Sequence, residues 1–395
     1  MRSNGLIFIV GILFIVLTDT FLFLEIKKYL RKKLYRLLYG LHTLLFLTGL
    51  LAYHLFIPAL KGPAIYYWVE LGIGILLLFY LPKVLFLSIN TLGLLFGLLF
   101  RSLGRLFRKT ALIISLALFL LLLYSITWGR YNYKLETETV CLKQLPSAFE
   151  GFKIVQLSDL HLGSYSAGYK GLPKLIREVN ALHPDLIVFT GDMVNNFASE
   201  MDPWIAELRQ LQAKYGKFAI TGNHDYGDYT LWSSPEKKIQ NRKDFFRNME
   251  AAGFTLLNNR HIPLSLGKDT LYLAGVENWG NPPFPRYGDL SQALQGAKER
   301  LTILLSHDPS HWKAEVLGTS IPLTLSGHTH AMQMGFKMGN YKWSPSQYIY
   351  PEFDGLYRQG EQYLYVSRGQ GYLGFPGRIG LRPVITEIIL TRNCD

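Results

Sequence analysis

Long runs of apolar residues dominate the first third of the chain. A membrane-crossing helix needs about 20 predominantly apolar residues, and four stretches within residues 1–130 meet that requirement. They predict helices over residues 6–24, 37–60, 65–90 and 111–128. A cleaved signal peptide is a poor explanation for the first stretch, because three more of the same kind follow it. We therefore expect an integral, multi-pass membrane domain over residues 1–130.

Basic residues flank these apolar runs. Residues 1–130 contain 14 Lys and Arg against three acidic residues, whereas residues 131–395 contain 27 basic and 26 acidic residues. Positive charge that is concentrated beside membrane segments indicates contact with lipid headgroups. We therefore expect membrane lipids as partners, and no nucleic acid.

The side of the membrane that the C-terminal part occupies depends on the stretch from Ile65 to Phe100, which Pro82 interrupts. The positive-inside rule places the basic clusters at 27–36 and 101–109 in the cytoplasm. One kinked helix gives four spans, which places both basic clusters in the cytoplasm and the C-terminal domain outside it. Two crossings give five spans and a cytosolic domain, but leave one cluster on the wrong side. We favour four spans.

From about residue 131 short strand-like runs alternate with amphipathic stretches. We expect a linker and first strand over residues 131–150, then a layered α/β domain over residues 151–395. Cys141 and Cys394 lie near the two ends of this part. They form a disulfide if the first and last strands pair in an oxidising compartment, and are otherwise two unpaired thiols.

Polar residues follow five of the strand-like runs, commonly beside a glycine that lets the backbone turn tightly. They are Asp159 and His161, then Asp192, then Asn223 with His224 and Asp225, then His307, and finally His328 with His330. A lone Asp after a strand is usually a cap or a turn residue, but five such endings in one domain are hard to explain in this way. In α/β domains, ligands bind beyond the carboxyl ends of the strands. Imidazole and carboxylate donors together suit Mn²⁺, Fe or Zn²⁺.

This ordered set resembles the calcineurin-like metallophosphoesterase family, whose blocks read D-x-H, G-D, G-N-H-D/E, a lone H and G-H-x-H. The resemblance covers roughly residues 150–390 and implies a four-layer α/β/β/α sandwich around two divalent metal ions. It implies a first metal on Asp159, His161, Asp192 and His330, and a second on Asp192, Asn223, His307 and His328. His224 would donate a proton or contact the phosphate, with Asp225 as its orienting partner.

The resemblance implies a phosphoesterase that hydrolyses phosphodiester or pyrophosphate bonds. Two cations about 3.5–4 Å apart lower the pKa of a bridging water and neutralise charge on the phosphoryl group. The membrane anchor favours a lipid-linked or cell-envelope substrate. The alternative is a membrane sensor or transport component whose phosphoesterase-like domain binds a ligand without catalysis.

Three features near the C-terminal end leave alternatives open. The C-terminal region resembles the membrane-anchored or exported phosphodiesterase branch of the family. That branch commonly follows its final histidine with two glycines and a Gln, whereas this chain has Ala331-Met332-Gln333, which puts the transfer of a relative's substrate in doubt. Arg368 either contacts a substrate phosphate or forms a structural salt bridge. The aromatic-rich span Tyr341–Tyr357 forms a lid, a membrane-facing wall or an ordinary packed loop.

Overall fold

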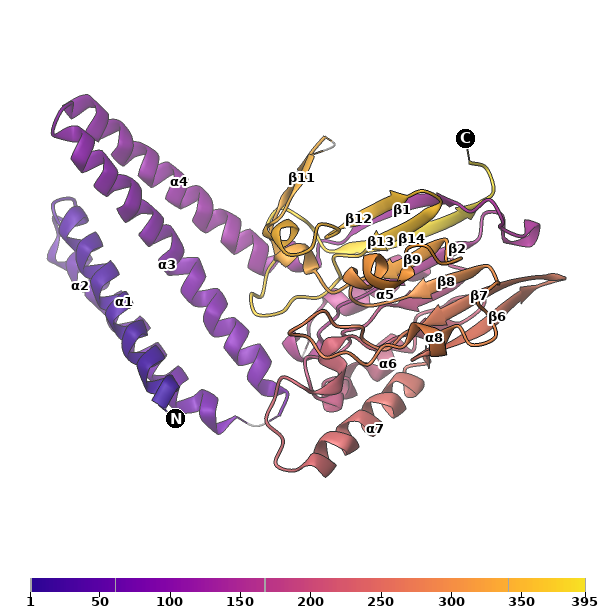
Figure 1. Cartoon of the computed structure of the whole chain (residues 1–395). Coiled ribbons are helices and arrows are strands. Elements are labelled where there is room, and N and C mark those ends of the chain that lie inside the picture. Colours follow the sequence, from indigo (N-terminus) through magenta and orange to yellow (C-terminus); the bar gives the residue numbers. More distant parts are fainter. Residues whose placement is uncertain (1, 61, 167, 340, 395) are drawn as a thin grey trace. The chain divides into compact units, whose positions relative to one another are not determined.

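The computed structural model describes residues 2–60, 62–166, 168–339 and 341–394. Positions 1 and 395, the outer limits of the predicted domains, lie outside these ranges. The chain divides into two compact units between Thr127 and Trp128, which we call the helical unit and the C-terminal unit (Figure 1).

The described part of the helical unit contains four helices that are long and apolar enough to cross a membrane. They are α1 (Arg2–Ile26), α2 (Lys33–Phe56), α3 (Ala64–Gly97) and α4 (Arg101–Thr127). The stretch that Pro82 interrupts is one helix, α3. Helix α4 begins ten residues before the predicted start at 111, because the basic segment 101–109 continues the helix instead of forming a turn.

Asp19 in α1 is buried and connects three of these helices. Its carboxylate accepts a hydrogen bond from Thr43 of α2 at 2.8 Å and another from Tyr80 of α3 at 3.0 Å. The ammonium group of Lys83, also in α3, lies 2.7 Å from it. An acidic residue in an apolar helix is costly unless it is paired, so these contacts explain how the helical unit accommodates it.

The described part of the C-terminal unit is built on two six-stranded sheets. The first has the order β1 (Lys134–Cys141), β14 (Val384–Thr391), β2 (Lys153–Leu157), β3 (Leu186–Phe189), β4 (Lys217–Ala219) and β5 (Thr255–Leu256). The second has the order β12 (Gly355–Gln359), β13 (Gln362–Val366), β9 (Leu323–Ser326), β8 (Thr302–Leu305), β7 (Asp269–Gly275) and β6 (Arg260–Leu266). Strands β2 to β5 run parallel to one another, as do β7, β8, β9 and β13.

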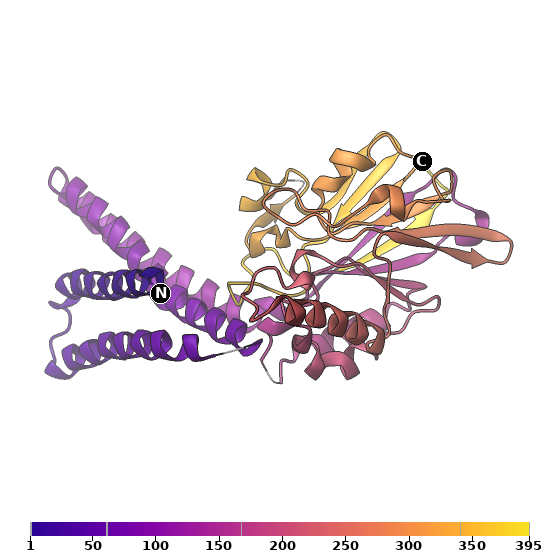
Figure 2. The ribbon, with the colours of Figure 1, turned by 60° about the horizontal axis from the view of Figure 1, so that its bottom comes forward.

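Alternate residues of the strands enter different cores, which gives the sandwich its layers. Ile154 of β2 and Leu305 of β8 belong to one core between the sheets, whereas the neighbouring Val155 and Leu304 belong to two outer cores. The outer cores pack the sheets against helices, as the two ribbon views show (Figures 1 and 2). These helices are α5 (Gly171–Asn180), α6 (Ile205–Leu208), α7 (Pro235–Ala251) and α8 (Leu290–Ala293). The predicted α/β/β/α arrangement is confirmed.

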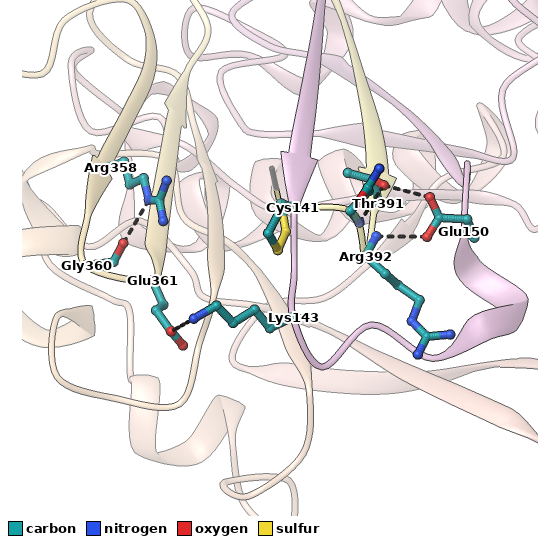
Figure 3. Close-up of a disulfide and its surroundings, with 10 residues drawn as sticks. Cys141, Lys143, Glu150, Arg358, Gly360, Glu361, Thr391 and Arg392 are labelled. Carbon is teal, nitrogen blue, oxygen red and sulfur yellow. Dashed lines mark hydrogen bonds and ion pairs between the residues drawn. A yellow bond between two sulfur atoms is a disulfide. The ribbon is translucent and has the colours of Figure 1, made fainter.

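A disulfide joins Cys141, at the end of β1, to Cys394, just beyond β14, with the two Cα atoms 5.2 Å apart (Figure 3). The two strands pair in parallel, with Cys141 opposite Thr391. The first and last strands are therefore neighbours, and of the two alternatives for the cysteines the structure has the bonded one.

Candidate metal centre

The sequence-predicted ligands meet where strands of both sheets end. Strand β2 leads to Asp159 and His161, β3 to Asp192, β4 to Asn223, β8 to His307, and β9 to His328 and His330. The carboxyl ends of parallel strands lie at one edge of a sheet, and in layered α/β domains such edges are where ligands bind. Stacking the two sheets brings the two edges together.

One group of candidate ligands is formed by Asp159, His161 and His330, each of which offers a ligand atom within 4.8 Å of the others. The Nε2 atoms of His161 and His330 are 3.0 Å apart. Nε2 of His330 is 3.3 Å from a carboxylate oxygen of Asp159. All three side chains are buried, so their donor atoms converge on one point away from solvent.

A second group is formed by Asp192, His307 and His328 under the same criterion. Nδ1 of His328 lies 3.3 Å from Nε2 of His307 and 2.9 Å from Oδ1 of Asn223. The Oδ2 atom of Asp192 is 3.1 Å from Nε2 of His307 and 3.6 Å from Nε2 of His161 in the first group. One carboxylate oxygen thus faces both groups, which is the placement that a bridging ligand requires.

Hydrogen bonds on the far side of each ring determine which nitrogen is free to bind a cation. His161 donates from Nδ1 to Oδ1 of Asn195 at 2.9 Å. His307 donates from Nδ1 to the carbonyl oxygen of Thr190 at 2.7 Å. In both rings Nε2, the nitrogen opposite this hydrogen bond, is the one that faces the other candidate ligands. This set of converging acceptors fits a pair of divalent cations.

The backbone at these strand ends adopts an unusual conformation. Five of the candidate ligands have positive φ: Asp159 at 55°, His161 at 50°, Asp192 at 61°, His328 at 73° and His330 at 49°. Each costs of order 1–3 kcal/mol, and such residues cluster at functional sites. Gly327 allows the segments to approach, because a Cβ there would lie 2.0 Å from Oγ of Ser158.

The electrostatics of the site favour positive charge at the point where the ligands meet. Burial lowers the pKa of His161 to about 3 and that of His328 to about 4, so both rings are neutral, the form that binds metal. Burial raises the pKa of Asp159 to about 7. Although burial opposes it, the carboxylate of Asp192 raises the pKa of His307 to about 10. The proton held between Asp192 and His307 occupies a position that a cation would also favour.

Comparisons with known proteins agree with this geometry. The calcineurin-like phosphoesterase family model matches residues 152–332. A Danio rerio protein named "Transmembrane protein with metallophosphoesterase domain" is 32% identical over 336 residues, which are 81% of this chain and 72% of that protein. The uncharacterized metallophosphoesterase YkuE of Bacillus subtilis is 35% identical over 276 residues, which are 67% of this chain and 88% of YkuE. The chain belongs to the calcineurin-like metallophosphoesterase family.

Among solved structures, a dimetal phosphatase from Danio rerio aligns with 56% of this chain and 88% of its own, at 13% identity and a TM-score of 0.34.

The family motif G-N-H-D is formed as the sequence predicts, but its last two residues do not pair with each other as expected. His224 donates from Nδ1 to the carbonyl oxygen of Asn195 at 2.9 Å. The carboxylate of Asp225 instead accepts four backbone N–H groups, from Gly222 and from residues 192, 193 and 194. Because these donors surround the buried carboxylate, Asp225 orients the metallophosphoesterase loops and not the His224 ring.

Several residues that support the ligands were missed by the sequence analysis. The hydroxyl of Tyr350 accepts a hydrogen bond from Nε2 of His328 at 2.8 Å, and the hydroxyl of Tyr229 accepts one from Nδ2 of Asn223 at 2.9 Å. Oδ1 of Asn195 orients His161. These side chains carry no motif of their own. The aromatic-rich span was the one signal that included Tyr350.

The residues after His330, which depart from the family pattern, adopt a left-handed backbone conformation. Ala331, Met332 and Gln333 have φ of 48°, 46° and 56°, the left-handed region in which glycine is at ease and other residues are strained. This metallophosphoesterase therefore retains, without the two glycines, a backbone conformation that glycine adopts readily. The Gln333 amide donates to the carbonyl oxygens of Phe375 and Gly377, which holds the strained segment in place.

We predict that Met332→Gly raises the free energy of unfolding of the C-terminal unit by about 1 kcal/mol, because it relieves left-handed strain. Met334 is a matched control, since it is similarly exposed and has an extended backbone with φ of −142°. Met334→Gly should lower the same free energy by about 0.5–1 kcal/mol. Guanidinium unfolding of the full chain in detergent micelles measures both. If both substitutions changed the free energy of unfolding in the same direction, position 332 would not be strained.

Proposed function

We propose that the protein is a membrane-anchored phosphoesterase that uses two divalent metal ions to hydrolyse phosphodiester or pyrophosphate bonds. The observation that carries the proposal is the position of Asp192, whose one carboxylate oxygen faces ligands of both groups. When bound, two cations supply a Lewis acid that activates water and neutralises the charge of the phosphoryl group. Mn²⁺, Fe and Zn²⁺ are compatible with the donor set.

The roles of the individual residues follow from their positions. We assign Asp159, His161, Asp192 and His330 to one metal, and Asp192, Asn223, His307 and His328 to the other. His224 is not among either group of converging donors, yet its ring centroid lies 4.9 Å from that of His161. Because Nδ1 is fixed on Asn195, Nε2 is the atom that would deliver a proton to the leaving oxygen.

Asp192→Ala tests the catalytic proposal, because it removes the shared ligand. We expect wild-type protein to hydrolyse bis(p-nitrophenyl) phosphate when Mn²⁺ is added, and the variant to lose this turnover. Asp244→Ala, which removes an Asp paired with Arg247 on the surface of α7, should retain it. An inactive wild-type protein, or an Asp192→Ala variant with full activity, would favour a ligand-binding sensor or transport component instead.

Tyr350→Phe tests the arrangement of the second metal without removing a ligand. Loss of the hydroxyl leaves Nε2 of His328 without its acceptor, and losing such a partner costs roughly 10- to 100-fold in metal affinity or activity. We expect a titration of the full chain with Mn²⁺ to show this loss of metal affinity. The control is Tyr348→Phe two residues away, at a side chain that is 77% exposed. Equal affinity in both variants would contradict the role of Tyr350.

We place the C-terminal unit on the extracytoplasmic side of a cell membrane. Four spanning helices put the basic residues of 27–36 and 101–109 on the cytoplasmic side, as the positive-inside rule requires. The Cys141–Cys394 disulfide agrees with this, because such bonds persist in oxidising compartments.

Alkylation of whole cells after rapid acid quenching tests this placement. Without a reductant, Cys141 and Cys394 of the full chain should remain unmodified, and prior reduction should make both reactive. The Cys141→Ser variant, in which Cys394 has no partner cysteine, shows the extent of alkylation expected for one free thiol. Both thiols reactive before reduction would favour a cytosolic domain and five spans.

A further inference from the structure

A hairpin with an exposed apolar face follows the last proposed metal ligand. Its strands β10 (Phe336–Met338) and β11 (Tyr341–Trp343) form a separate two-stranded sheet, and Figure 1 shows β11 projecting from the two large sheets. An isolated hairpin is marginally stable in water at best. The two strands therefore need further contacts to be stable.

The two faces of the hairpin differ in chemistry. Directly paired residues share a face, and the pairs Phe336–Trp343 and Met338–Tyr341 alternate with the pair Lys337–Lys342. One face is thus entirely apolar and aromatic, and the other is basic. On the apolar face the rings of Phe336 and Trp343 stack with centroids 5.7 Å apart. Met338 is 72% exposed and Tyr341 55%, so the described residues of the chain leave much of this face uncovered.

The basic face is attached to the C-terminal unit. The ammonium group of Lys342 lies 2.7 Å from a carboxylate oxygen of Asp354. The other Asp354 oxygen pairs with the buried guanidinium of Arg368 at 2.8 Å, which also pairs with Glu136 of β1. Of the two alternatives for Arg368, the structure has the salt bridge. Because this network holds one face inward, it fixes the apolar face outward.

The apolar surface extends beyond the hairpin. Further exposed side chains of the same segment are Met332, Met334, Tyr348 and Ile349. Exposed apolar side chains gathered in one segment indicate a site of contact with a membrane or a protein. Trp and Tyr together with Lys are the composition of the membrane–water interface, which favours lipid as the occupant.

The base of the hairpin lies beside the point where the chain enters the C-terminal unit. Gly335 donates its N–H to the carbonyl oxygen of Ile379 at 3.0 Å. Three residues later, Arg382 donates to the backbone and side-chain oxygens of Asn132, at 2.8 Å in each case. Asn132 is five residues beyond Thr127, the last residue of α4. The short segment 379–382 therefore contacts both the base of the hairpin and the chain that leaves the apolar, membrane-length helix α4.

From these observations we propose that the apolar face of β10–β11 inserts into the lipid interface. The substrate is then a phosphate ester carried on a lipid, with its phosphate at headgroup depth. Met332 is two residues from His330 in sequence, and Tyr350 contacts His328, so both ends of the apolar segment adjoin the proposed metal centre. The substrate class rests on the proposed function, whereas the lipid contact does not.

A fluorescent label on the hairpin tests the lipid contact without requiring activity. The full chain with Met338→Cys carries bimane and is placed in vesicles of phosphatidylcholine and phosphatidylglycerol; the native cysteines are bonded to each other and do not react. Lipids with brominated chains should cause a loss of fluorescence at this position, and aqueous iodide should not. The control is Lys268→Cys, at the exposed turn between β6 and β7, where we expect the reverse.

Two results would overturn the lipid contact. Quenching at position 338 by iodide but not by brominated lipid means that the face lies in water. Quenching by neither reagent means that protein covers it, either a second copy of the chain or another partner. Since the label reports contact alone, these results are independent of whether the protein proves to be an enzyme.

The substrate class has a separate test. Phe336→Ser should lower the turnover of a vesicle-borne nitrophenyl phosphodiester more strongly than that of soluble bis(p-nitrophenyl) phosphate. An equal loss on both substrates would show that the hairpin supports the fold of the site and not the recognition of lipid. Wild-type activity on the soluble ester alone would overturn the lipid-linked substrate and leave the phosphoesterase proposal intact.

Discussion

The buried carboxylate of Asp192 is the constraint around which the rest of the C-terminal unit is arranged. An isolated buried carboxylate is very costly, yet in this protein the neighbouring charge of His307 keeps the pKa of Asp192 well below its usual range, although burial alone would raise it. Its other oxygen accepts the backbone N–H of His224 at 2.9 Å. Both sheets must therefore end at the same place, because the groups that stabilise Asp192 come from both.

This requirement explains the strain at the strand ends. Residues that would ordinarily avoid the left-handed region adopt it where the chain turns away from a strand to present a ligand. The groups behind the ligands, such as the carbonyl oxygen of Thr190 and the hydroxyl of Tyr350, then fix the orientation of each ring. Burial of the ligands, strain in the backbone and hydrogen bonds behind the rings together hold the donor atoms in one arrangement.

The sequence was most informative where chemistry and position coincide in a few consecutive residues. Motifs such as Gly222-Asn223-His224-Asp225 indicate the family, the α/β layers and the residues that meet at the site, because each motif is local. Contacts between distant segments were less predictable. The pairing of β1 with β14, the acceptors around Asp225 and the partner of His328 all depend on the folded arrangement of strands, which composition and spacing do not encode. The early start of α4 has a different cause: the charged residues of 101–109 suggest a turn between apolar segments, but Arg and Lys are good helix formers and continue the helix.

The position of β14 within the first sheet has a consequence for biosynthesis. This strand lies between β1 and β2 and pairs with both, although about 230 residues separate it from β2 in the chain. The sheet that presents Asp159, Asp192 and Asn223 is therefore complete only after residues 384–391 have left the ribosome. Until then β1 and β2 lack their shared neighbour, although a nascent chain truncated before β14 already contains every candidate metal ligand.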